Sequence, residues 1–125
     1  MVFGLISSSL YVKGFVGVFG VYAAQSLLTP KKMTEDHWDM KSTPAMEFWI
    51  RGLSVPMFAT CYLMMQVPAT VAAPVALFCS AAIGVLYPWN AKFGFLTPGL
   101  PLKYPMHYVP EALMLGLTVA GILTL

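Results

Sequence analysis

The chain has 125 residues, of which 58% are hydrophobic and only 10% are charged, whereas an ordinary soluble domain carries about 25% charged residues. Its seven Lys and Arg with five Asp and Glu are too few to cover the surface of a soluble protein of this size. The net charge of +2 also excludes the continuous basic surface of a nucleic-acid-binding protein. Composition therefore predicts a membrane protein.

Four apolar segments follow one another, each close to the roughly 20 residues with which a helix crosses a bilayer. The segments are 10–29, 48–66, 68–87 and 106–125. Pro30 closes the first, and Pro68 suits the first turn of the third because a proline lacks the amide hydrogen. We therefore expect one all-α domain, an integral membrane four-helix bundle with both termini on the same side.

The charged residues lie on one side of this arrangement. All of them except Lys13 fall in or beside the loops 30–47 and 88–105. The positive-inside rule then places these two loops in the cytosol, stroma or matrix. We expect an organellar membrane, the thylakoid first and the inner mitochondrial membrane as the alternative.

Arg51 and Glu111 each lie about one turn inside a predicted span and enter the membrane from the same face. A charge inside a span is costly unless it is paired, so we expect an ion pair that links the second and fourth helices. Glu47 lies four positions before Arg51 and is a second candidate partner. The structural interpretation is a clamp between helices. The functional alternative makes Glu111 a proton-handling or substrate-binding carboxylate.

His107 stands at the entrance of the fourth segment among aromatic residues. It could ligate the magnesium of a chlorophyll, with Phe93, Phe95, Tyr104 and Tyr108 as an apolar shelf. The alternative is an interfacial anchor. No other metal site is predicted, and the cofactors considered are chlorophyll, carotenoid or lipid.

Small residues recur every three or four positions in three of the segments, a spacing that lets helix backbones approach closely. The predicted helix-packing residues are Gly14, Gly17, Gly20, Ala76, Ser80, Gly84, Ala112, Gly116 and Ala120. They indicate tight packing and carry no catalytic information. The proline-rich and aromatic segment 87–108 is predicted to form a stiff cap that lies on the bilayer or against a partner.

The sequence EFWIRG, which contains Glu47, Arg51 and Gly52, opens the second segment after Thr29-Pro30 has closed the first. In this the first half of the chain resembles the small four-helix DoxX-like membrane proteins, in which an acidic residue and an Arg-Gly pair commonly open the second helix. The resemblance implies a four-helix membrane fold and, for some members, quinone-related redox chemistry. The chain departs from a redox protein because no pair of His or Cys residues faces the bilayer.

The small size and the lack of a catalytic constellation favour a non-catalytic accessory subunit of a large multi-subunit membrane complex. We expect a photosynthetic complex of the photosystem type, with a respiratory complex as the alternative. The partners would be membrane lipids and larger membrane subunits, with no nucleic acid. Two alternatives stay open: a DoxX-like protein acting at the quinone level with Arg51 and Glu111 at a headgroup site, and a small proton-coupled transporter that uses Glu111.

Overall fold

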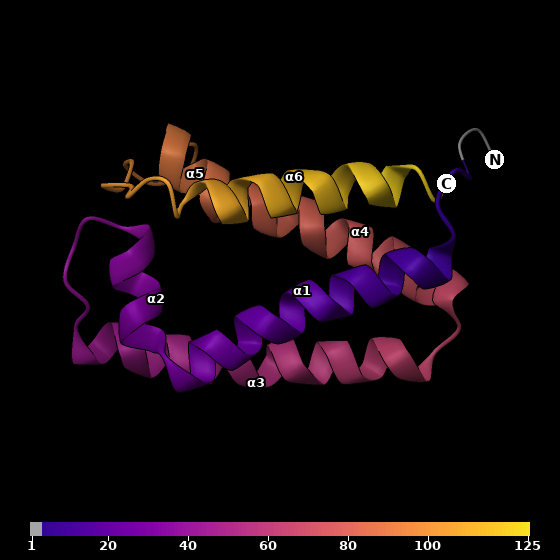
Figure 1. The fold of residues 1–125 in the computed structure, drawn as a ribbon, viewed down its shortest axis with the longest axis horizontal. Coiled ribbons are helices and arrows are strands. Elements are labelled where there is room, and N and C mark those ends of the chain that lie inside the picture. Colours follow the sequence, from indigo (N-terminus) through magenta and orange to yellow (C-terminus); the bar gives the residue numbers. More distant parts are fainter. Residues whose placement is uncertain (1–3) are drawn as a thin grey trace.

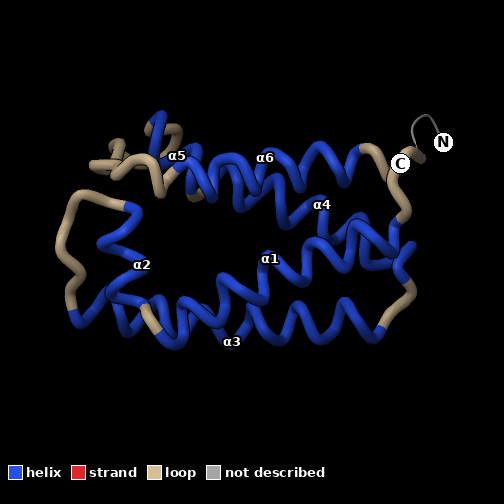
Figure 2. The backbone as a smooth tube through the Cα atoms, in the orientation of Figure 1, coloured by secondary structure: helices blue, strands red, loops and turns tan. Residues whose placement is uncertain are grey.

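The computed structural model describes residues 4–125, which fold into helices joined by short loops (Figures 1 and 2). The helices are α1 (Ser8–Leu28), α2 (Pro30–His37), α3 (Pro44–Gln66), α4 (Ala69–Leu86), α5 (Pro88–Phe93) and α6 (Tyr108–Ile122). Residues 4–125 contain no strand, and a single β-bridge joins Trp38 to Leu102. The predicted all-helical class is confirmed.

Local sequence explains where the helices begin. The Ser7 hydroxyl accepts a hydrogen bond from the Leu10 amide at 3.1 Å, and the Thr43 hydroxyl accepts one from the Met46 amide at 3.2 Å. Such caps satisfy amides that have no partner inside the helix. Proline at the first position of α2, α3 and α5 also pre-sets the helical φ angle. Segments 30–47 and 88–105, expected as loops, therefore each contain a short helix.

Among residues 4–125, three helices are long and apolar enough to cross a membrane: α1, α3, and α4 taken together with α5 as Ala69–Phe93. This indicates a membrane protein. The helix α6, which corresponds to the fourth predicted segment, has 15 residues. At 1.5 Å per residue it is about 22 Å long, which is shorter than a hydrocarbon core of about 30 Å. The predicted segment 106–125 thus contains a shorter helix than expected.

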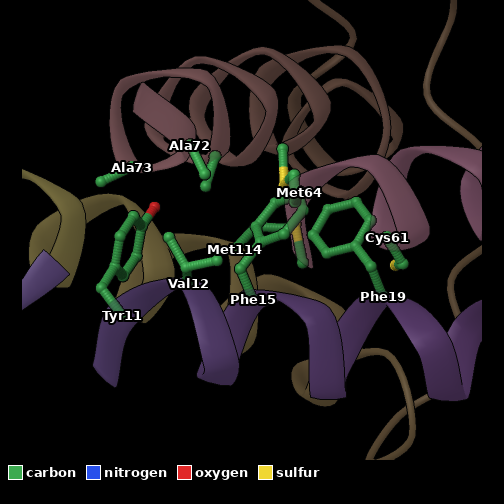
Figure 3. Close-up of a cluster of buried hydrophobic side chains, with 10 residues drawn as sticks. Tyr11, Val12, Phe15, Phe19, Cys61, Met64, Ala72, Ala73 and Met114 are labelled. Atoms are coloured by element: carbon green, nitrogen blue, oxygen red, sulfur yellow. The ribbon is translucent and has the colours of Figure 1, made fainter. Parts of the chain in front are cut away.

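The core is a narrow seam in which α1 lies against α3 and α4, while α4 also packs on α6. It contains three aromatic residues of α1, Tyr11, Phe15 and Phe19, and the rings of Phe15 and Phe19 stack with centroids 4.0 Å apart (Figure 3). Cys61 and Met64 of α3 and Met114 of α6 close the seam. Most other large apolar side chains face outward, as expected for helices surrounded by lipid or by other proteins.

The small residues of α4 lie in a helix interface. Ala76, Ser80 and Gly84 are buried, and a Cβ added to Gly84 would lie 3.2 Å from the Cβ of Met114. Their spacing of four keeps them on one face of α4, where they allow α6 to approach closely.

The glycines of α1 do not line a helix interface, so the prediction for Gly14, Gly17 and Gly20 was wrong. A Cβ added to any of the three would meet no atom within 4 Å. The buried face of α1 instead carries residues spaced by four, namely Tyr11, Phe15, Phe19 and Ala23. At about 100° per residue, all three glycines lie roughly 120–180° around the helix from that face, on the opposite side of α1.

The predicted packing face of α6 was also wrong. Ala112 and Gly116 are exposed and Ala120 is only partly buried, whereas the buried residues are Glu111, Met114 and Gly121. At about 100° per residue, the inward face lies roughly 170° around the helix from the predicted face, which is nearly its opposite side. The cause is Glu111, which is buried against its partners on α5 and in the loop before α6, as described below.

Candidate functional site: the Glu111 cluster

Arg51 and Glu111 do not form the predicted ion pair. Arg51 donates from Nε to the carbonyl of Leu27 at 3.2 Å, at the carboxyl end of α1, and none of the salt bridges within residues 4–125 includes it. The physical reason is the order of the helices: α3 and α6 are not in contact, because α1 and α4 lie between them. A cation is favourable at the end of α1, where unpaired carbonyls give the helix its negative pole.

Glu47 does not pair with Arg51 either. Its Oε2 accepts a hydrogen bond from the Ser42 hydroxyl at 3.3 Å, in the loop that leads into α3. Glu47 and Arg51 line a shallow charged hollow between α2 and the start of α3. Lys31, Lys32 and Asp36 line it as well. Lys32 bonds Asp36 at 2.9 Å, and this hydrogen bond lowers the pKa of the Asp36 carboxyl. The hollow is open and its charges are largely solvated, so its ion pairs contribute little stability.

Glu111 is the centre of a different cluster, here called the Glu111 cluster and formed by Lys92, Tyr104, His107 and Glu111. The Oε1 of Glu111 accepts from Lys92 Nζ at 2.9 Å. Its Oε2 accepts from the Tyr104 hydroxyl at 2.9 Å and from His107 Nδ1 at 2.7 Å. The Glu111 side chain is only 5% exposed, and charge-assisted hydrogen bonds of this kind are the strong ones.

Aromatic rings surround the Lys92 ammonium. Its Nζ lies between 5.5 and 5.9 Å from the ring centroids of Trp89, Phe93, Tyr104 and Tyr108. These distances fall within the range of cation–π attraction. Three of the four residues that the sequence suggested as a shelf for a pigment, Phe93, Tyr104 and Tyr108, thus surround the ammonium of Lys92, and Trp89 takes the place of Phe95.

The turn after α5 brings Lys92 to Glu111. Gly94 ends α5 in the left-handed conformation with φ of 67°, and a Cβ there would lie 3.2 Å from the carbonyl of Thr97. Glycine adopts this conformation without a steric penalty, so the chain can reverse directly after α5. The loop then returns to α6, and Lys92 at the end of α5 faces the first turn of α6.

The loop that follows Gly94 is fixed by Asn90. The Asn90 Oδ1 accepts from the Leu96 amide at 2.7 Å and the Thr97 amide at 3.4 Å, and its Nδ2 donates to the Thr97 hydroxyl at 3.0 Å. A second connection joins this loop to the one after α2. The Asp39 amide donates to the Pro101 carbonyl at 2.7 Å, and the Lys103 amide donates to the His37 carbonyl at 2.9 Å.

We predict that Asn90→Ala loosens this loop. The Leu96 and Thr97 amides would lose their acceptor, so their hydrogen exchange should become at least about tenfold faster, as follows from the loss of about 1.4 kcal/mol of local stability. Hydrogen–deuterium exchange read by mass spectrometry measures this. Asn90→Asp keeps the acceptor oxygen and should leave the two amides protected. Equal exchange in Asn90→Ala and the unmodified chain would contradict the role given to Asn90.

Tyr104 stays a hydrogen-bond donor in the cluster. Desolvation raises the pKa of its hydroxyl above the ordinary value, and the hydrogen bond to Glu111 raises it further. The proton therefore remains on Tyr104 at neutral pH.

The Glu111 carboxylate, which accepts from three donors, is held in one position. This suits a clamp that fixes α5, the loop 94–107 and α6 to one another.

His107 is buried, and its Nδ1 is occupied by Glu111. Its ring lies between Trp38 at 5.9 Å and Tyr104 at 6.0 Å, both edge-on. Ligation of a pigment by His107 would have to use the other ring nitrogen. Within residues 4–125 no group of three or more His, Cys, Asp or Glu side chains could hold a metal ion.

The sequence contains a partial signal for this cluster. His107 and Glu111 are four positions apart, a spacing at which helical side chains meet, although His107 itself is the cap of α6. Lys92 and Tyr104 had no comparable signal, because their positions depend on the turn at Gly94 and the path of the loop. The separation of Arg51 from Glu111 also removes the shared headgroup site considered for a quinone-level protein.

A search with this chain matched no family model, no curated protein and no solved structure. The resemblance to DoxX-like proteins therefore depends only on Thr29-Pro30, Glu47 and the Arg51-Gly52 pair.

Proposed function

We propose that the chain is a non-catalytic accessory subunit of a large multi-subunit membrane complex, in which α1, α3, α4 and α6 form a membrane-embedded four-helix bundle. The Leu5 amide donates to the Leu123 carbonyl at 2.9 Å, which supports placing both termini on one side (Figure 1). The loops that carry most of the charge then lie on the stromal, matrix or cytosolic side.

The observation that carries the proposal is an ordered apolar surface outside the long helices, here called the cap surface: Phe93, Phe95, Leu96 and Leu100, all exposed. Asn90 and the bridge to the loop after α2 hold this segment in one conformation. Exposed apolar groups on a fixed scaffold are typical of a surface that a partner covers. A larger membrane subunit is the partner that this surface fits.

The Glu111 cluster favours the same role over proton transport. Glu111 is saturated by donors from Lys92, Tyr104 and His107, and this arrangement resembles a structural clamp more than a carboxylate that binds and releases a proton. The same geometry supports an anchoring role for His107 over pigment ligation. We place the complex in an organellar membrane, with a photosystem of the thylakoid as the first choice and a respiratory complex as the second.

Purification in mild detergent tests the proposal. A tagged chain extracted from its native membrane should migrate on a native gel with a large complex, and mass spectrometry of that band should identify larger membrane subunits. An absorption spectrum of the band separates a pigmented from a respiratory complex. Migration of all the protein as a free monomer or dimer would contradict the proposal.

The cap surface gives a more specific prediction. The double substitution Phe95→Ala and Leu96→Ala should reduce the comigrating fraction at least about tenfold, because two apolar side chains that the partner covers contribute more than about 1.4 kcal/mol. Phe78→Ala with Leu63→Ala is the matched control, since both side chains are exposed on α4 and α3. This control should keep the comigrating fraction. Equal losses in both double variants would show that the cap surface has no special role.

A further inference from the structure

The charged loops mark one boundary of the membrane on α1 and α3. Arg51 Nε donates to the carbonyl of Leu27 at 3.2 Å, which places Arg51 level with the end of α1. Arg51 also lines the charged hollow, together with Lys31, Lys32 and Glu47. Charged side chains in an open hollow need water. The hydrocarbon core of the bilayer therefore begins after Arg51, toward the carboxyl end of α3.

Aromatic side chains agree with this boundary. Phe48 and Trp49 lie shortly before Arg51 on α3 and are 70% and 69% exposed. Their rings meet edge to face with centroids 5.7 Å apart. Exposed tryptophan is typical of the interface between membrane and water. The first turns of α3 thus lie in this interface, and only the part of α3 after Arg51 crosses the hydrocarbon.

The turn between α3 and α4 marks the opposite boundary. Gln66, Val67 and Pro68 form this turn and are exposed, at the end of the bundle where both chain ends lie (Figure 1). Helix ends leave backbone amides and carbonyls without helical partners, and hydrocarbon offers them none, so the turn has to reach water. Gln66 lies fifteen positions after Arg51, or about 22 Å along the helix. The hydrocarbon that α3 crosses is therefore at most about 22 Å thick.

Two other helices have the same apolar length. The 15 residues of α6 extend over about 22 Å. On α1 the exposed Lys13 lies fifteen positions before Leu28, which is again about 22 Å. The Lys13 ammonium can extend toward the far surface, so it limits the thickness less strictly than a backbone turn does.

The helix α4 is longer, with 18 residues or about 27 Å. It is inclined to α3, which shortens the distance that it spans across the bundle (Figure 1). A helix that is too long for a bilayer can tilt in this way, but a helix that is too short cannot lengthen. The mismatch of the shorter helices therefore falls on the lipid.

We propose that the chain fits a hydrocarbon core of about 22 Å and prefers lipids with short acyl chains. An ordinary core is about 30 Å thick, so a bilayer of ordinary lipids has to thin by about 8 Å beside this protein. This inference depends on the membrane placement of the bundle in the proposed function, but it does not depend on a partner subunit.

Reconstitution of the isolated full chain tests the match. The protein is placed in phosphatidylcholine vesicles whose monounsaturated acyl chains have fourteen, eighteen or twenty-two carbons, and its rate of unfolding by SDS is followed by tryptophan fluorescence. Unfolding should be slowest with fourteen carbons and at least about tenfold faster with twenty-two, because the cost of mismatch grows with every ångström. Slowest unfolding with eighteen or twenty-two carbons, or equal rates in all three lipids, would overturn the proposal. Since no partner is present, a chain that fails to join a complex can still pass this test.

Two exposed valines of the α3 region locate the far boundary. Val55 lies four positions after Arg51, about 6 Å inside the proposed core, whereas Val67 lies in the turn, just outside it. In the eighteen-carbon vesicles, Val55→Glu should prevent insertion or speed unfolding at least about tenfold, because a carboxylate facing lipid is costly. Val67→Glu should change the rate by no more than about threefold.

The two substitutions make the same chemical change, so each is the control for the other. With a core of about 30 Å that begins at Arg51, both valines would lie about 6 Å inside the hydrocarbon and both variants would suffer alike. Equal effects of Val55→Glu and Val67→Glu would therefore show that the turn lies in hydrocarbon and that the proposed thickness is wrong.

Discussion

Gly121→Leu should destabilise the protein by about 1–3 kcal/mol, the usual cost of overpacking a close-packed interior. A Cβ at this position would lie 2.7 Å from the Tyr11 hydroxyl and 2.9 Å from Leu77 Cδ1. Tyr11 is only 3% exposed and its hydroxyl lies 3.5 Å from Ser80 Oγ, so its ring cannot move aside without disturbing the core. Titration of the purified protein with SDS, followed by tryptophan fluorescence, measures the loss.

Gly116→Leu is the matched control for this experiment. Gly116 lies five positions earlier on the same helix, and a Cβ there would meet no atom within 4 Å. Leucine has a higher helix propensity than glycine by up to about 1 kcal/mol, so stability should be unchanged or slightly higher. Equal destabilisation by both substitutions would mean that α6 does not approach α1 at Gly121.

The positions of the long helices followed from the sequence because charges and prolines mark their ends. The first segment was predicted over 10–29 and α1 covers Ser8–Leu28, while the third was predicted over 68–87 and α4 covers Ala69–Leu86. The helix α3, which corresponds to the second predicted segment, begins at Pro44, four residues earlier than predicted, because Thr43 caps it. Thr43 followed by Pro44 is the sequence signal for this helix start.

The neighbours of each helix could not be predicted in the same way. The expected pair of Arg51 and Glu111 required the second and fourth spans to touch, but α1 and α4 separate α3 from α6. Depth in a membrane can be inferred from the sequence, because it depends on distance from the end of a span. Lateral order depends on side-chain fit between helices, which no local pattern reports.

The glycines of α1 illustrate the same limit. Repeated glycine is compatible with close helix packing, but it is equally compatible with an open groove when a neighbouring helix diverges. Phe15 and Phe19 hold α1 against α3, so the side that carries Gly17 is left facing an open groove beside α6. Which of the two faces packs was decided by the aromatic side chains, whose spacing of four was also visible in the sequence.

Glu111→Gln should also destabilise the protein, by about 2–3 kcal/mol. Removing one partner of a buried ion pair costs about 3–5 kcal/mol, and the lower value applies here because Lys92 is 32% exposed and can regain water. The glutamine keeps the size of the side chain. It removes the negative charge of the carboxylate, whose oxygens accept hydrogen bonds from Lys92, Tyr104 and His107. SDS titration measures the change, and loosening of the loop 94–107 should accompany it in hydrogen exchange.

Glu47→Gln is the matched control, because it makes the same chemical change at a residue with one long hydrogen bond, 3.3 Å from the Ser42 hydroxyl. Glu47 lies in the first turn of α3, where loss of a negative charge costs at most about 1 kcal/mol. A large difference between the two variants identifies Glu111 as a clamp. If Glu111→Gln left stability and loop exchange unchanged, the carboxylate would not hold α5 and α6 together, and a role in proton handling would become the better explanation.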